Sequence, residues 1–239
     1  MKTPKLILAL LLGCSINAPG QFSTYDNSFS SGFANNGNVP EGSLSGWSDS
    51  ERLSGESGTI TSVTVNLDIA GGYNGSLYAY LTYDGLLVSL LNRVGVGFAT
   101  PTSSAFGYGD SGFDITLSSS SSANVHFYQT IPGYNINGDG QLTGTWQPDG
   151  SAISPLSAPS SFDSSPGAQT LNSFAGLNPN GTWTLYVADV ATGGGQSQID
   201  SYGLEITTVP EPGGLLSAGL FLLGTLLRKD RVRKGGNSA

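Results

Sequence analysis

Cysteine is almost absent from this chain, with Cys14 as the only one among 239 residues. Cys14 lies within the first 20 residues, so the rest of the chain has no thiol for a disulfide or a cysteine-ligated metal. A long domain without disulfides must be held by its hydrophobic core, and about 190 residues are enough chain to bury one. The composition therefore excludes a small disulfide-stapled scaffold.

Basic side chains are equally scarce between residues 21 and 208. This region contains 15 Asp/Glu, only Arg52 and Arg93 as basic residues, and no lysine, which gives it a net charge of −13. Binding to phosphate backbones requires a basic surface, so we exclude nucleic acid as a partner. An acidic surface rich in Gly, Ser and Asn suits a soluble protein outside the cell, and cation binding is a second interpretation.

Long apolar runs are missing too, since none reaches the ~18 residues of a typical spanning helix. The N-terminal run, Leu6–Leu12, follows two lysines and precedes small residues. This layout is typical of a secretory signal peptide, and Ala18–Gly20 favours cleavage by signal peptidase before Gln21. In a second interpretation Leu11–Cys14 is a lipobox, and Cys14 would be lipidated and become the mature N-terminus.

The C-terminal apolar run, Gly213–Leu227, has 15 uncharged residues and is followed by a basic cluster. As a helix rising ~1.5 Å per residue it would cover ~22 Å, less than the ~30 Å hydrocarbon core of a bilayer. The basic cluster would stay in the cytoplasm and leave residues 21–208 outside. A plain C-terminal membrane anchor is one interpretation of this hydrophobic helix.

The order of the C-terminal segments indicates more than an anchor. Residues 209–234 read V-P-E-P, then the apolar run, then the basic cluster, and this order resembles the PEP-CTERM sorting signal of Gram-negative bacteria. The resemblance rests on Val209, Pro210, Glu211, Pro212, Arg228, Lys229, Arg231 and Arg233. It implies a transient anchor in the inner membrane, recognition and removal of the tail by an exosortase, and delivery to the cell surface or to a biofilm matrix of exopolysaccharide.

Residues 21–208 show strand patterns and no convincing amphipathic helix. Apolar and polar residues alternate, or short apolar runs end at turn residues, in six segments: Ile60–Ile69, Leu77–Leu81, Leu86–Leu91, Phe113–Leu117, Thr182–Val187 and Ile199–Ile206. Turns rich in Gly, Asn and Asp separate them. This pattern predicts an all-β domain, an antiparallel β-sandwich or jelly roll.

Two parts of this region resemble the P domain (P/Homo B domain), the jelly-roll module that follows the catalytic domain in proprotein convertases. The first part reads I-T-S-V-T-V-N-L-D-I at 60–69 and G-S-L-Y-A-Y-L-T-Y-D-G at 75–85. The second reads P-N-G-T-W-T-L at 179–185 and continues through Asp189 to the closing segment at 199–206. The resemblance implies a jelly-roll sandwich over 59–208. The preceding segment, 21–58, begins with an aromatic stretch rich in Gly, Ser and Asn, and we interpret it as a lead-in or edge strand.

P domains accompany subtilisin-like serine proteases, so a protease activity has to be weighed. A serine nucleophile needs a base and a third group that orients the base. The chain has one histidine, His126, and no Gly-x-Ser-x-Gly or Gly-Thr-Ser motif. We therefore predict no catalysis and interpret His126 as a polar strand residue.

Calcium is the one candidate cofactor. Asn135, Asn137 and Asp139 have the spacing of the first three oxygen ligands in an EF-hand loop. The twelfth position is Trp146 instead of the bidentate Glu, so a hairpin turn is the alternative interpretation. Three other acidic residues at predicted strand ends form a second candidate group, Asp68, Asp189 and Asp200. Asp189 is also expected to brace the glycine-rich turn at 193–195.

Aromatic residues make carbohydrate a third candidate ligand. The side chains considered are Trp47, Tyr73, Tyr78, Tyr80, Tyr108 and Trp146. Strand alternation places Tyr78 and Tyr80 on the face opposite Leu77 and Leu81. Cross-strand tyrosine pairs that stabilise a sheet are the alternative interpretation.

The sequence thus predicts a signal peptide at 1–20, a lead-in at 21–58, a P-domain-like sandwich at 59–208 and a sorting signal at 209–234. We expect a non-catalytic, exosortase-sorted structural or adhesive protein of the cell surface or extracellular matrix. The alternatives are a carbohydrate- or calcium-binding accessory module and a P domain that assists a separate subtilisin-like protease. Expected partners are signal peptidase, exosortase and exopolysaccharide.

Overall fold

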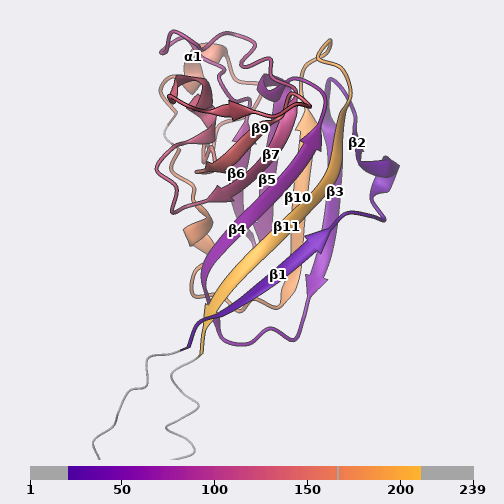
Figure 1. Cartoon of the computed structure of the whole chain (residues 1–239), viewed down its shortest axis with the longest axis vertical. Coiled ribbons are helices and arrows are strands. Elements are labelled where there is room, and N and C mark those ends of the chain that lie inside the picture. The colour runs from indigo at the N-terminus through magenta and orange to yellow at the C-terminus, as the bar shows by residue number, and fades with distance from the viewer. Residues whose placement is uncertain (1–20, 166, 211–239) are drawn as a thin grey trace, which may run out of the picture.

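The computed structural model describes residues 21–165 and 167–210 (Figure 1). Its strands are β1 Ser23–Phe29, β2 Asn38–Val39, β3 Ser43–Leu53, β4 Thr59–Ala70, β5 Leu77–Tyr83, β6 Leu86–Asn92, β7 Gly112–Ser118, β8 Asn135–Ile136, β9 Leu142–Trp146, β10 Gly181–Asp189 and β11 Ser197–Val209. Helical segments are short: α1 Pro159–Phe162 and the 3-10 turns η1 Ala34–Gly37, η2 Asn74–Ser76, η3 Val125–Thr130 and η4 Leu171–Phe174. In these ranges no helix has the length and apolar character needed to span a membrane. The expected signal peptide, and the sorting signal beyond Pro210, lie outside the described residues.

The strands form two sheets. The larger has seven strands in the order β1-β11-β4-β7-β9-β8, with β2 also paired to β11. The smaller has four, in the order β3-β10-β5-β6. Strands of both sheets contribute to one continuous cluster of buried apolar residues, so the core lies between them. The prediction of an all-β domain built from two sheets is confirmed.

Alternation along the strands explains which face each sheet buries. In β4, Val63, Val65, Leu67 and Ile69 are nearly inaccessible, while the residues between them face outward. Successive side chains of a strand point to opposite faces, so one hydrophobic row per strand is enough to build the core. The same rule leaves a polar row from each strand on the outer surface.

One strand pair departs from the predicted antiparallel arrangement. β7 and β9 are parallel, with Phe113 opposite Leu142 and Leu117 opposite Trp146. A parallel neighbour requires a crossover of about a dozen residues or more, whereas an antiparallel neighbour needs only a tight turn. The connection at 119–141, which contains η3 and β8, supplies that length. The purely antiparallel prediction is therefore wrong at this pair.

The first and last strands of the described chain lie side by side. β1 is antiparallel to β11, from Ser23 opposite Thr208 to Phe29 opposite Tyr202. The start of β1 and the end of β11 therefore lie together at one end of the molecule (Figure 1). The segment 21–58 also contains β2 and β3, so it contributes strands to both sheets.

Trp183 is a large buried residue of the core, at the end of the molecule where β1 starts and β11 ends. Its indole stacks on the ring of Tyr83, with centroids 3.9 Å apart and ring planes 4° from parallel. Its ring nitrogen donates a hydrogen bond to the carbonyl of Pro179 over 3.1 Å. Phe174 packs edge-on against the indole at 5.1 Å. Burial and a satisfied N–H together allow a large aromatic side chain to stabilise a core.

We expect Trp183→Ala to lower the free energy of unfolding by about 3–5 kcal/mol, because it deletes a large, 1% exposed side chain from the core. Urea denaturation followed by circular dichroism measures the loss. Phe106→Ala is the matched control, since Phe106 is 81% exposed and its removal should change stability by less than about 0.5 kcal/mol. Equal losses in the two variants would contradict this assignment of the core.

Candidate functional site

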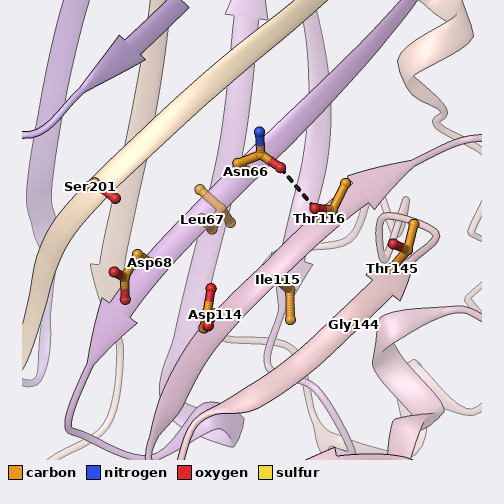
Figure 2. Close-up of a pocket in the computed structure, with 9 residues that line it drawn as sticks. All are labelled: Asn66, Leu67, Asp68, Asp114, Ile115, Thr116, Gly144, Thr145 and Ser201. Carbon is orange, nitrogen blue, oxygen red and sulfur yellow. Dashed lines mark hydrogen bonds between the residues drawn. The ribbon is translucent and has the colours of Figure 1, made fainter.

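The outer face of the seven-stranded sheet contains a shallow hollow of about 310 Å³ (Figure 2). Residues of β4, β7, β9 and β11 line it. Its polar side chains are Asn66, Asp68, Asp114, Thr116, Thr145 and Ser201. The hollow is therefore a polar surface that crosses four adjacent strands.

Strand register brings these side chains together. Asn66 lies opposite Thr116, and Asp68 lies opposite Asp114, in the antiparallel pairing of β4 with β7. The parallel pairing of β7 with β9 adds Thr145 directly beside Thr116. Because the apolar neighbours in these strands point into the core, the polar set must face solvent.

The paired carboxylates Asp68 and Asp114 are the unusual feature of the hollow. Like charges directly opposite each other in a sheet are destabilising. Asp200 lies next to this pair, and burial together with the charge of Asp68 raises the pKa of the Asp200 carboxyl. Across residues 21–165 and 167–210, the structure contains no salt bridge from Arg or Lys to any of these carboxylates. The two carboxylates therefore place hydrogen-bond acceptors side by side on the surface of the hollow.

Several hydrogen-bonding groups in the hollow remain available. Thr116 Oγ1 donates to Asn66 Oδ1 over 2.8 Å, the bond drawn in Figure 2. Gln141 Nε2 donates to Asp68 Oδ1 over 2.9 Å. Within the part of the chain that the structure describes, the Asn66 amide N–H groups, the Asp114 carboxylate and the Ser201 hydroxyl make no side-chain hydrogen bond. The hollow thus presents both donors and acceptors on an open surface.

The predicted EF-hand-like residues form a hairpin turn. Asn135 belongs to β8, which pairs with β9. Asn137 Oδ1 accepts hydrogen bonds from the backbone N–H groups of Asp139 and Gln141, both at 3.0 Å. The oxygen expected to bind Ca²⁺ therefore already closes the turn. The structure therefore has a hairpin turn at Asn135–Asp139, which was the alternative to a calcium-binding loop.

The second candidate metal group is divided between the two sheets. Asp68 and Asp200 are neighbours, because Ser201 pairs with Asp68 across β4 and β11. Asp189 ends β10 in the other sheet and is fully buried. Among the described residues no three His, Cys, Asp or Glu side chains are placed to share a metal ion. The three carboxylates therefore do not form one site.

The predicted carbohydrate-binding aromatics are mostly engaged with the protein. Trp47, Tyr108 and Trp146 are buried, which corrects the expectation that they are available to a ligand. Tyr80 stacks on Tyr186 at 4.6 Å with ring planes 16° apart. Tyr78 packs edge-on against Tyr80 at 5.7 Å, so the outward tyrosines largely cover one another. The structure thus contains cross-strand tyrosine pairs, which was the alternative to a sugar-binding row of tyrosines.

His126 lies in the 3-10 turn η3, which corrects its interpretation as a strand residue. The Asn124 side chain caps this turn by accepting the His126 N–H over 2.7 Å. His126 Nδ1 lies 2.6 Å from Asp149 Oδ2, and Nε2 lies 3.1 Å from the Val96 carbonyl oxygen. Both ring nitrogens face acceptors, so neither is positioned to activate a serine.

The His126–Asp149 contact couples stability to pH. Burial lowers the pKa of the His126 imidazole, but the hydrogen bond and charge of Asp149 and the Val96 carbonyl outweigh burial and raise it above 6.5. Stabilisation by the protonated ring is therefore complete below about pH 6.5 and is lost as pH rises through the raised pKa. Neither His126 nor Asp149 belongs to the residues that line the hollow.

We expect the melting temperature of the wild type to exceed that of His126→Asn most at about pH 6, and the difference to shrink towards pH 8.5. Calorimetry at closely spaced pH values measures this difference. Asp149→Asn should flatten the profile in the same way, because it removes the negative charge beside His126. A difference that stays constant over this range would show that the charge on His126 contributes nothing.

Comparisons with known proteins identify no family. No family model matches the chain, and neither does any curated protein. The crystal structure of the Aeromonas sobria serine protease in complex with its chaperone aligns over 80% of this chain and 28% of its own, with 14% identity and a TM-score of 0.46. The structure of the serine protease of Aeromonas sobria aligns over 79% and 27%, with 14% identity and a TM-score of 0.43. This chain therefore spans under a third of either structure, and neither match decides a family, an activity or a partner.

Proposed function

We propose that the protein is an exported, non-catalytic adhesive module, with a sandwich of the jelly-roll, P-domain type, that binds polysaccharide at the cell surface or in the extracellular matrix. The observation that carries the proposal is the open polar hollow on the outer face of β4, β7, β9 and β11. Its shape and its chemistry fit a flexible, hydroxyl-rich chain better than a small molecule that must be enclosed.

The polar groups of the hollow match those of a saccharide. Each sugar hydroxyl donates one hydrogen bond and accepts others, so it pairs with carboxylates, amides and hydroxyls. Asp68 and Asp114 supply acceptors, Asn66 supplies donors, and Ser201 and Thr145 supply both. Hydrogen bonds to a charged acceptor contribute about 1.5–3 kcal/mol each, more than those between neutral groups.

The negative charge of residues 21–208 limits which polysaccharides the module would bind. The region 21–208 carries −13, and two carboxylates face each other in the hollow. Uronate-rich or sulfated chains would be repelled, whereas neutral or amine-bearing chains would not. The proposed ligand is therefore a neutral or amine-bearing polysaccharide.

The sorting part of the proposal rests on the sequence at the two ends. Residues 1–20 would be removed by signal peptidase, and the 209–234 segment would be recognised by an exosortase while the chain is transiently held in the inner membrane. Val209, which begins V-P-E-P, is the last residue of β11 and pairs with Thr59. The motif thus starts where the sheet ends, and a cut there would leave the sandwich intact.

We expect the exported protein to be retained by cellulose or partly deacetylated chitin. We expect no retention by pectate, a polymer of uronic acid. Asn66→Ala combined with Asp114→Ala should weaken retention about tenfold or more, because it removes a donor and a charged acceptor from the hollow. Sedimentation of the protein with each insoluble polymer, and affinity electrophoresis with pectate in the gel, measure the change.

Asp139→Asn is the matched control, because it neutralises a carboxylate in the β8–β9 turn and should leave retention unchanged. Stronger retention on pectate than on the neutral polymers would contradict the proposed charge selection. Equal retention of the wild type and the double variant would exclude the hollow as the binding surface.

A further inference from the structure

Two acidic side chains lie on neighbouring connections that cross between the sheets. Glu41 lies between β2, in the seven-stranded sheet, and β3, in the four-stranded sheet. Asp189 ends β10 in the four-stranded sheet, and the next loop leads to β11 in the other. These connections run side by side, because Ser43 pairs with Asp189 and Val39 pairs with Ser197.

Both carboxylates bind the same short stretch of backbone. Asp189 Oδ1 accepts a hydrogen bond from the N–H of Ala191 over 3.2 Å, and Glu41 Oε1 accepts one from the N–H of Gly193 over 2.6 Å. Gly42 packs closely on Thr192, since a Cβ at Gly42 would lie only 2.5 Å from Thr192 Cγ2. The two acids therefore converge on residues 191–193.

One carboxylate oxygen of Asp189 is buried without a hydrogen-bond partner among the described residues. This oxygen is Oδ2, and the Asp189 side chain is 0% exposed. Burial, with a smaller contribution from the charge of Glu41, raises the pKa of Asp189 to about 6 in spite of the hydrogen bond from Ala191. The Ser197 hydroxyl, at the far end of the same loop, is also fully buried and unpartnered in this part of the chain.

A buried carboxylate is costly unless a positive charge or a proton balances it. In the described ranges, neither Asp189 nor Glu41 forms a salt bridge. The guanidinium group of Arg93 donates instead to the carbonyls of Gly75 and Pro155. No side chain of the described sandwich supplies a positive charge to Asp189, so either a proton or a bound cation balances its carboxylate.

We propose that Asp189 and Glu41 hold a divalent cation of the calcium type between loops 40–42 and 190–196. Calcium prefers six to eight oxygen ligands and accepts carboxylates, backbone carbonyls and water in flexible geometry. Asp189 supplies a buried oxygen at the base of the site, and the exposed Glu41 supplies one at its rim. An ion at this position would link the two loops that connect the sheets. The site is independent of the polar hollow on the outer face of the large sheet.

The test is thermal unfolding of the exported protein after removal of metal with EDTA. Addition of 5 mM CaCl₂ should raise the melting temperature by about 2–8 °C, given dissociation constants of about 0.1–1 mM for extracellular calcium modules. Addition of 5 mM MgCl₂ should raise it by less, because Mg²⁺ requires a near-ideal octahedral site. Asp189→Asn should abolish the calcium shift, and Glu41→Gln should reduce it.

Asp139→Asn is the matched control and should keep the full calcium shift, because Asp139 belongs to the β8–β9 turn. The proposal is overturned if calcium leaves the wild-type melting temperature unchanged, or if Asp189→Asn responds like the wild type. If Asp189→Asn fails to fold, Glu41→Gln decides alone, since its side chain is exposed: an undiminished shift overturns the proposal. Calcium insensitivity together with a more stable Asp189→Asn would identify Asp189 as a buried, protonated acid.

Discussion

The pairing of β11 with both β4 and β1 is the interaction on which the architecture depends. β11 runs from Ser197 to Val209, and both partners come from the first third of the described chain. β1 extends this pairing from Ser23 opposite Thr208 to Phe29 opposite Tyr202. Both ends of the described chain therefore leave the sandwich at one end, and the outer face of the large sheet stays uncovered along β4 and β11 (Figure 1).

This arrangement separates the features that matter for function. The polar hollow lies on the outer face of the large sheet, across β4, β7, β9 and β11. The Asp189–Glu41 pair lies where the chain crosses between sheets, at the end opposite the start of β1. A module tethered through its terminal segments would thus present both features away from the tether.

Local sequence patterns predicted the strands whose inward rows are apolar, such as β4, β5, β6, β10 and β11. They missed β3, because Asp49 and Glu51 occupy its inward positions and Asp49 accepts a hydrogen bond from the buried Tyr202. The hollow was also missed except for Asp68, because Asn66, Asp114 and Thr145 meet only through the strand order β4-β7-β9. Pairing order and direction are set by the tertiary fold, and the local period of a strand does not encode them.

Export of the sandwich and its release at V-P-E-P can be measured together by the intact mass of the mature protein from a Gram-negative host that carries an exosortase. We expect a chain that begins at Gln21 and lacks the basic residues at 228–234. Replacing Val209–Pro212 with alanines should leave the tail attached. A mature wild-type protein that retains Arg228 to Lys234 would show that the chain is not released at V-P-E-P.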